Sequence, residues 1–243
     1  MKNWIFLILI ALPFTGFSQE DMDEGVMSSV KQTVTNTSVD LDYLEDQFYV
    51  GFTYDYLAVK ATNVVQHNLS RGIHAGFLRD IPINAKRTVG FAAGLGYAYD
   101  RVYNNMLATK TATGVDYQIV ERFKDLDLSR NFFETHTVEF PIEFRYRTST
   151  PESHKFWRVY TGLRLGYIFS ERSLNTRSSV STSFQNPDIN KTFQCKAFAV
   201  FGYNALNFFV QYNLTPLMKD AHTADGTSLK SNVLQIGLMF YIL

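Results

Sequence analysis

Apolar residues alternate with small ones along residues 87–103, which read RTVGFAAGLGYAYDRVY. From Val89 to Tyr99 every second residue is apolar or aromatic, and the residues between them are glycine or alanine. Because successive side chains of a strand point to opposite faces, this pattern predicts a β-strand with one large apolar face and one nearly empty face. Small residues fit the narrow interior of a closed barrel, so the large face is predicted to point outward into lipid.

Seven further stretches alternate in a similar way, which predicts about eight strands in total. They are residues 47–58, 69–81, 132–147, 156–170, 191–203, 206–214 and 231–243. The links between strands alternate between short and long. The short links lie at 82–86, 149–154 and 204–205, and the long polar links lie at 60–68, 104–131, 172–190 and 218–230.

An even strand number with alternating link lengths is typical of outer-membrane barrels, whose periplasmic turns are short and whose extracellular loops are long. The predicted fold class is therefore all-β, a transmembrane antiparallel up-and-down β-barrel of about eight strands. A soluble barrel of the lipocalin kind would place its large apolar residues inside and would not need this alternation of links. The glycines on the inward face of residues 87–103 are expected to make room for long charged side chains of neighbouring strands.

The chain begins with a segment that has the features of a signal peptide. Lys2 precedes a short apolar run at residues 4–12, and Gly16-Phe17-Ser18 offers a small-x-small cleavage site. We therefore assign residues 1–18 to a signal peptide, with an N-terminal membrane anchor as the alternative. Residues 19–46 are acidic and rich in Ser and Thr, which predicts a flexible periplasmic lead-in or a docking segment for a partner. The barrel is assigned to residues 47–243.

Composition excludes several classes of function. Lys plus Arg and Asp plus Glu number 23 each, so no net positive field points to nucleic acid. The single cysteine, Cys195, excludes an intramolecular disulfide and a multi-thiolate metal site. The histidines are scattered, and no cluster has the spacing of metal ligands, so neither a metal nor another cofactor is expected. The 21 Phe and 14 Tyr residues suit strands and the two membrane interfaces.

Several charged residues fall on the inward faces of the predicted strands. An eight-stranded barrel has room inside for side chains and little else, so an open pore is not expected. Charges in such a space must be paired, which predicts a structural carboxylate–guanidinium network between the strands at 132–147 and 156–170. A proton or ion pathway is the alternative. The residues of this predicted network are Asp55, Asp100, Glu139, Glu143, Arg145, Arg147, Arg158 and Arg164.

Some small outer-membrane barrels modify lipid A, and one group of residues is a candidate for such an enzymatic site. Glu134, His136 and Glu139 lie together near the outer end of the fourth predicted strand. A hydrolase would need a serine close to that histidine, but position 138 is Val and no serine shares that face of the strand. No catalytic residues are therefore expected.

The longest predicted loop, residues 104–131, mixes charged and apolar residues. Its apolar residues Val115, Tyr117, Ile119 and Phe123 are predicted to form an exposed surface that docks a partner. Alternation over residues 114–120 suggests a hairpin within the loop. A mobile loop without a partner is the alternative.

The chain as a whole resembles the PorT-like family of small outer-membrane β-barrel proteins, which are associated with type IX secretion and gliding motility. The resemblance is carried by a signal peptide ending in FSQ, the acidic lead-in, and the segments FYVGFTYDYLAVK, GFAAGLGYAYDRVYNN, HTVEFPIEFRYRT and NVLQIGLMFYIL. It implies an integral outer-membrane protein that is not an enzyme, has no cofactor and is needed to export proteins bearing a C-terminal sorting domain.

The resemblance also implies partners. These are outer-membrane lipid and other proteins of the secretion apparatus, with no nucleic acid and no small-molecule substrate. The alternatives are a structural or adhesion barrel of the OmpX kind and, third, a lipid A-modifying enzyme.

Overall fold

The computed structural model describes residues 46–148, 156–189, 193–204, 206–218 and 221–242. The predicted signal peptide (1–18) and all but the last residue of the predicted lead-in (19–46) lie outside the described residues. That last residue, Asp46, is the first residue of strand β1, so the barrel begins one residue before the predicted boundary.

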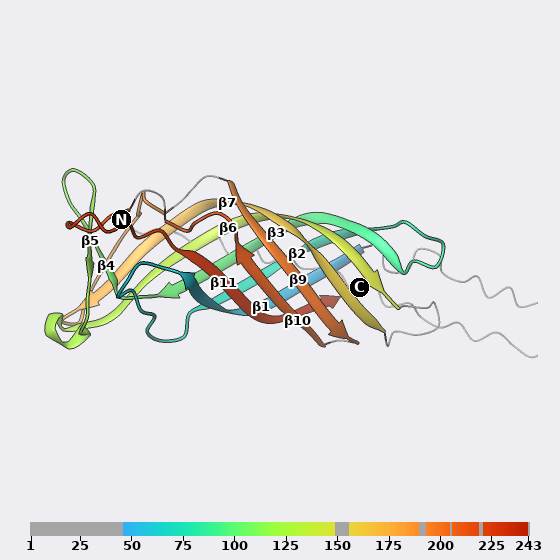
Figure 1. Ribbon diagram of the computed structural model, residues 1–243, viewed down its shortest axis with the longest axis horizontal. Coiled ribbons are helices and arrows are strands. Elements are labelled where there is room, and N and C mark those ends of the chain that lie inside the picture. The colour runs from blue at the N-terminus through green and yellow to red at the C-terminus, as the bar shows by residue number, and fades with distance from the viewer. Residues whose placement is uncertain (1–45, 149–155, 190–192, 205, 219–220, 243) are drawn as a thin grey trace, which may run out of the picture. The chain divides into compact units, whose positions relative to one another are not determined.

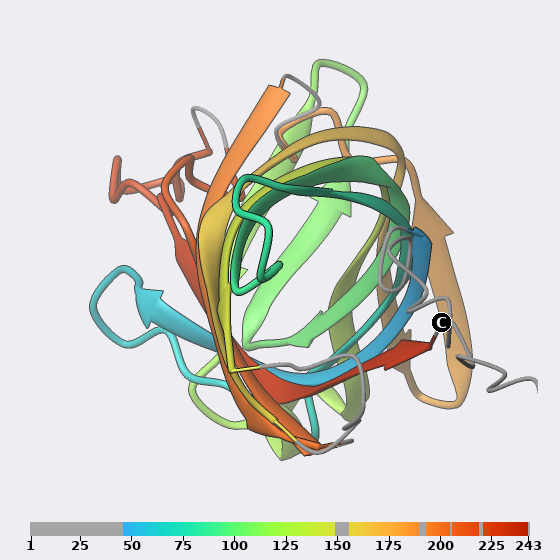
Figure 2. The ribbon, with the colours of Figure 1, turned by 90° about the vertical axis from the view of Figure 1, so that its right-hand side faces the viewer.

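Eight strands of the described chain form a closed antiparallel barrel, as the alternation predicts (Figures 1 and 2). Each strand pairs with the next barrel strand along the chain, and β11 pairs with β1 to close the ring. The strands are β1 (Asp46–Val59), β2 (Arg71–Pro82), β3 (Val89–Tyr103), β6 (Leu128–Arg147), β7 (Trp157–Arg177), β9 (Phe193–Tyr203), β10 (Leu206–Asn213) and β11 (Asn232–Ile242).

Three short strands and one 3-10 helix lie in the long links. Strands β4 (Met106–Lys110) and β5 (Val115–Ile119) form a hairpin, and the helix η1 (Phe123–Leu126) follows it. Strand β8 (Val180–Phe184) pairs with the end of β7. In Figure 1 the described parts of the long links gather at the end of the barrel where β4 and β5 are labelled, and the short link 83–88 lies at the opposite end. No helix in the described residues is long and apolar enough to cross a bilayer.

Strands β6 and β7 extend beyond the predicted limits of 132–147 and 156–170. They continue to pair with each other as far as Leu128 and Arg177. Residues 171–177, which read ERSLNTR, are mostly polar on both faces. The apolar alternation therefore fades where the strands leave the apolar belt, although their backbone hydrogen bonds continue.

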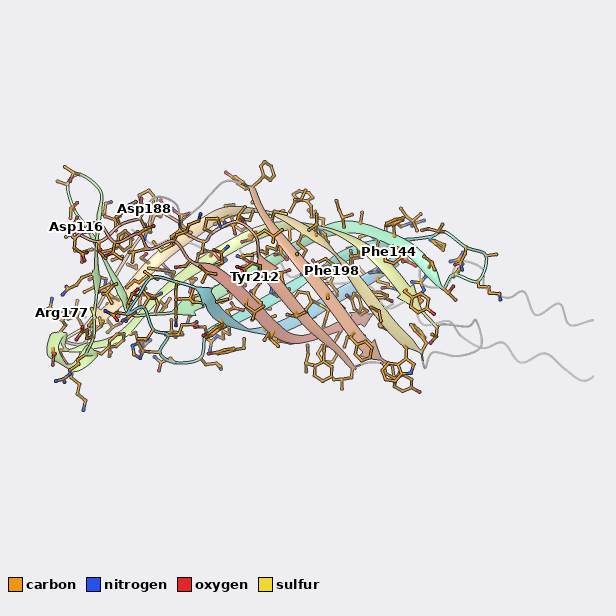
Figure 3. All side chains as sticks on the ribbon, in the orientation of Figure 1. Asp116, Phe144, Arg177, Asp188, Phe198 and Tyr212 are labelled. Carbon is orange, nitrogen blue, oxygen red and sulfur yellow. The ribbon has the colours of Figure 1, made fainter. Side chains whose placement is uncertain are left out.

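The outer wall of the barrel is apolar. In β3, Phe91 is 49% exposed whereas its neighbour Ala92 is 1% exposed, so the large face points outward as predicted. Aromatic side chains lie on the outer wall toward both ends, including Tyr54, Tyr97 and Tyr167 toward the long links. Figure 3 shows Phe144 at the other end, opposite Arg177 and Asp116. The exposed apolar wall includes Phe48, Phe52, Ile73, Leu95, Phe140, Ile142, Leu163, Phe208 and Ile236.

The barrel interior is filled by side chains in layers. At the end with the long links, loop residues and strand ends form a buried cluster that we call the apolar plug. Toward the other end a second cluster, the aromatic layer, fills the barrel, and Figure 3 labels its Phe198. The plug contains Leu57, Val64, Val102, Met106, Ala108, Tyr117, Phe133, Ile168, Ile189, Leu217, Met218, Ala221, Leu229 and Val233. The aromatic layer contains Tyr49, Leu78, Ala92, Tyr160, Phe198, Val200, Phe209 and Met239.

Glycines on β2 and β3 make room for Tyr49. Gly76 and Gly96 lie opposite each other in the register of these strands. A Cβ atom added to either residue would meet the Tyr49 hydroxyl. The expectation that the inward glycines of residues 87–103 accommodate charged chains of neighbouring strands is therefore wrong for Gly96, because a buried tyrosine from β1 occupies the space.

We predict that Gly96→Leu prevents the barrel from closing, because the added side chain would overlap Tyr49 in a filled interior, at a cost of at least about 1–3 kcal/mol. The protein should lose the compact, heat-modifiable band that folded barrels show on a detergent gel. Ala93→Leu is the matched control, since Ala93 is exposed on the outer face of the same strand, and it should keep the band. A Gly96→Leu protein with an unchanged band would contradict the inward assignment of this face.

Candidate functional site

A fully buried carboxylate in the barrel interior, that of Glu139 on β6, binds three basic side chains. Its Oε1 accepts a hydrogen bond from Lys196 Nζ on β9 at 2.9 Å. Its Oε2 lies 3.3 Å from Arg164 Nη1 on β7 and 3.3 Å from His74 Nδ1 on β2. The side chains of Glu139, Arg164 and His74 are fully buried, and that of Lys196 is nearly so. One carboxylate therefore ties together four strands of the barrel.

Two further carboxylates, from β1 and β3, join this group. Gln235 Nε2 on β11 donates hydrogen bonds to Asp55 Oδ1 at 2.9 Å and to Asp100 Oδ1 at 2.8 Å. Lys196 Nζ lies 3.7 Å from Asp100 Oδ2, so this lysine joins the two halves. We call the set His74, Asp55, Asp100, Glu139, Arg164, Lys196 and Gln235 the Glu139 network.

A second network, centred on Arg145, lies nearer the short links. Arg145 donates to Glu143 Oε2 from Nε at 2.9 Å and from Nη2 at 2.8 Å. It also donates to Asp80 Oδ1 at 3.2 Å and to Gln47 Oε1 at 3.0 Å. Arg147 Nη2 donates to the other Asp80 oxygen at 2.5 Å. These side chains form the Arg145 network.

Aromatic rings join the two networks to the aromatic layer. The guanidinium carbon of Arg164 lies 4.8–5.1 Å from the ring centres of Tyr49, Phe198 and Phe209. The guanidinium carbon of Arg145 lies 4.8 Å from the ring centre of Tyr160. Such contacts are attractive because the face of an aromatic ring is negative.

The structure brings seven of the eight predicted interior residues into these networks. Arg158 is buried too, but it lies outside both networks as defined above, and its guanidinium carbon is 4.6 Å from the ring centre of Phe156. The interior ion pairs are not confined to the fourth and fifth barrel strands, because Glu139 of β6 also binds Lys196 of β9 and Arg145 of β6 binds Asp80 of β2. The prediction omitted His74 and Asp80, although the inward parity of Asp80 in residues 69–81 would have indicated it.

The interior leaves almost no space for a solute. One cavity of about 20 Å³ lies beside Asp100, Lys196 and Gln235, which is room for about one water molecule. The apolar plug closes the barrel on one side of the Glu139 network, and the aromatic layer fills it on the other. Among the described residues no group of His, Cys, Asp and Glu side chains is placed to hold a metal ion. The charged interior is therefore suited to holding strands together.

The predicted docking surface on residues 104–131 is not an exposed apolar patch. Tyr117 is only 4% exposed, and its hydroxyl donates a hydrogen bond to Asn186 Oδ1 at 2.8 Å. Burial raises the pKa of this hydroxyl above its ordinary value. Val115 and Ile119 pack against the apolar plug, and the Phe123 ring packs on His67 with 4.4 Å between ring centres. The prediction that these apolar residues form an exposed surface was wrong, because the β4–β5 hairpin folds onto the mouth of the barrel.

A polar cluster lies on the outer wall near the long links. We call its six residues the outer-rim cluster: Tyr97, Tyr99, Arg101, Glu134, His136 and Arg172. Glu134 Oε2 accepts hydrogen bonds from the Tyr99 hydroxyl at 2.6 Å and from Arg101 Nη2 at 2.6 Å. Glu134 Oε1 accepts one from Arg172 Nη2 at 2.5 Å. The Tyr97 hydroxyl is hydrogen-bonded to His136 Nδ1 at 2.6 Å.

A serine does lie opposite His136, although on the neighbouring strand. Ser170 of β7 is its register partner, where a bulge shifts the pairing of β6 with β7. The bulge changes which residues of β7 face outward, so simple alternation over residues 156–170 missed this serine. The ring nitrogens of His136 face other groups, because Nδ1 bonds Tyr97 and Nε2 lies 3.9 Å from Glu134 Oε1. With these partners, His136 is not oriented to act as a general base for Ser170.

Comparison with known proteins gives one family. The family described as "Outer membrane protein beta-barrel domain" matches residues 17–219, which is most of the chain. No curated protein matches the chain. Among solved structures, Ail, the attachment invasion locus protein of Yersinia pestis, is similar, with 11% sequence identity and a TM-score of 0.34. The likeness covers 81% of this chain and 97% of that one, and at this TM-score it carries no argument about function.

We predict that Glu139→Gln strongly destabilises the barrel, because it leaves Lys196 and Arg164 buried without their carboxylate. Breaking a buried ion pair by removing one partner typically costs about 3–5 kcal/mol. Urea unfolding of the protein in lipid vesicles measures the loss. Glu121→Gln is the control, since Glu121 is exposed in a loop, and its midpoint should stay close to that of the unaltered protein. Equal midpoints for the two variants would contradict the central role of Glu139.

Proposed function

The chain belongs to the family of proteins with an outer membrane β-barrel domain, and from this premise we propose that it is a non-enzymatic component of a protein secretion apparatus that binds partner proteins. It is a small integral protein of the outer membrane, whose apolar outer wall lies in lipid. Its function then depends on whether solutes pass through the barrel or partners bind to its surface.

The filled interior is the observation that carries this proposal. The two buried charge networks, the aromatic layer and the apolar plug occupy the barrel along its length. A transported solute would have to displace fully buried side chains such as Arg145 and Arg164, each held by ion pairs. Removing charged groups from their partners in such an interior is costly. Function at the exposed surfaces is therefore favoured over conduction.

A free strand edge supports partner binding. The sheet of β6, β7 and β8 continues past the barrel, and β8 lies at its edge with β7 as its one neighbour among the described strands. Residues Val180 to Ser183 are exposed, and they include neither a proline nor a charged residue. Such an edge offers unpaired backbone groups to which an extended polypeptide can add as another strand.

The secretion role itself is supported by the resemblance to the PorT-like family over nearly all of the mature chain. Under this proposal β8 is a contact for other proteins of the type IX apparatus, and residues 19–45 are a second contact on the periplasmic side. Cargo bearing a C-terminal sorting domain would then depend on this barrel for export, without any chemistry at the barrel.

A structural or adhesion barrel of the OmpX kind is the second candidate, and the same edge of β8 favours it. Because β8 extends from the end with the long links, it would be presented outside the cell, where it could pair with a foreign protein. The third candidate, a lipid A-modifying enzyme, is disfavoured by the orientation of His136 toward Tyr97 and Glu134.

The β8 edge can be blocked without disturbing its pairing with β7. Residues 178 and 179 join the two strands, and both have positive φ, at 46° and 65°, as a two-residue type I′ turn requires. Arg177 and Val180 are then a hydrogen-bonded pair, so the N–H groups of Ser181 and Ser183 point to the open edge. A proline at position 183 removes one of these donors and is tolerated on an edge strand.

We predict that deleting the gene abolishes export of a reporter that bears a C-terminal sorting domain, and that the unaltered gene restores it. The Ser183→Pro variant should restore export poorly, because the partner can no longer pair along β8, whereas the control Ser183→Val should restore it fully. Export is measured by immunoblotting the culture medium. Normal export in the deletion strain would overturn the secretion role. Full restoration by Ser183→Pro would instead remove only β8 as the contact.

A further inference from the structure

The outer-rim cluster borders a polar pocket on the outside of the barrel. The pocket has a volume of about 390 Å³ and lies between the outer face of β6 and β7 and the strand β8. The β6 and β7 side is lined by Glu134, His136, Ser170, Glu171 and Arg172, and the other side by Ser183, Phe184 and Gln185. Because it lies at the end with the long links, this pocket is at the level of the outer-leaflet headgroups.

An apolar groove of about 520 Å³ lies on the outer wall beside the cluster. Its narrow floor is Ala75 of β2, which lies in register between Val50 of β1 and Tyr97 of β3. Phe77 and Leu95 flank the floor toward the short links. A small residue between larger neighbours leaves a furrow, which on a lipid-facing wall fits an acyl chain.

Tyr97 joins the two features. Its ring lines the apolar groove, and its hydroxyl is hydrogen-bonded to His136 Nδ1 at 2.6 Å, while the His136 ring lines the polar pocket. The pocket is polar and lies at the rim, and the groove is apolar and lies toward the middle of the membrane. Together they match an amphipathic molecule that lies along the barrel wall.

The net positive charge around the outer-rim cluster favours the binding of an anion. Arg101 and Arg172 share the single carboxylate of Glu134, and Arg71 is the register partner of Arg101 on the outer face of β2. Three guanidinium groups against two carboxylates, those of Glu134 and of Glu171 in the pocket lining, leave this part of the rim net positive. The Arg172 side chain is 46% exposed, and its bond to Glu134 uses Nη2. A guanidinium has five N–H donors and binds phosphate in a bidentate manner.

We propose that this side of the barrel is a binding site for a phosphorylated lipid of the outer leaflet. The phosphate binds Arg172 at the polar pocket, Arg101 adds its positive charge from β3, and one acyl chain lies in the groove over Ala75. Glu134 binds both arginines, and the Tyr99 hydroxyl donates to the same carboxylate. The site does not depend on the proposed secretion role, because it uses only the outer wall and the rim.

The full chain, purified in phosphatidylcholine nanodiscs, tests this site with two probes. The probes are lipid A with its phosphates and the same lipid A after phosphatase treatment, and native mass spectrometry measures how much of each the barrel retains. Retention of the phosphorylated form should be at least about tenfold higher, since charge-assisted hydrogen bonds contribute on this scale. Equal retention of the two forms by the unaltered protein would overturn the proposal.

Two variants examine the two halves of the site. Arg172→Gln should abolish the preference for the phosphorylated probe, and Ala75→Phe should lower retention by filling the groove. Arg79→Gln is the matched control, because Arg79 is an exposed arginine at the opposite rim, paired with Asp46 at 2.9 Å, and it should change nothing. Gel mobility with and without heating verifies folding of each protein.

Inorganic phosphate separates a lipid site from a site for free anions. It should compete only weakly with phosphorylated lipid A, because it lacks the acyl chain. Efficient competition by phosphate together with an unaffected Ala75→Phe variant would overturn the lipid assignment. Unchanged retention in Arg172→Gln would overturn the headgroup assignment, provided that the variant keeps the gel mobility of the folded protein.

Discussion

The barrel depends on a buried carboxylate that satisfies charges from its neighbours. Glu139 binds Lys196, Arg164 and His74, so β2, β6, β7 and β9 meet at one side chain. A narrow barrel must fill its interior with its own side chains, and charges placed there are tolerated only when paired. The Arg145 network repeats this solution nearer the short links. The rings of the aromatic layer lie against the guanidiniums of both networks.

Because side chains fill the interior, we expect the function at the surfaces of the barrel. The apolar plug draws Tyr117 and loop residues such as Leu217 and Ile189 over the barrel mouth, so the hairpin that might have served as a docking patch is part of the core. The exposed features near the long links include the edge of β8 and Arg172 of the outer-rim cluster. The first offers unpaired backbone to a polypeptide, and the second offers a guanidinium group beside an apolar groove. These two features suit different ligands and can act independently.

Alternation along the sequence predicted the strands and their inward residues because it records which side of the wall each residue faces. It could not predict which inward charges meet, since that depends on the stagger between strands distant in sequence, as for Glu139 with Lys196. The alternation ends before the observed ends of β6 and β7, because polar residues occupy both faces of these strands there. It missed Ser170 opposite His136, because a bulge in β7 changes the parity of the residues beyond it. The burial of Tyr117 reflects a contact with Asn186, 69 residues away.

The most direct test of this account is the electrical conductance of the purified barrel in a planar lipid bilayer. A barrel whose interior is filled by the Glu139 and Arg145 networks and closed by the apolar plug should insert without producing stepwise ionic current. A reproducible single-channel conductance from the unaltered, folded protein would mean that the interior opens to ions. It would contradict the claim that this barrel works only through its surfaces.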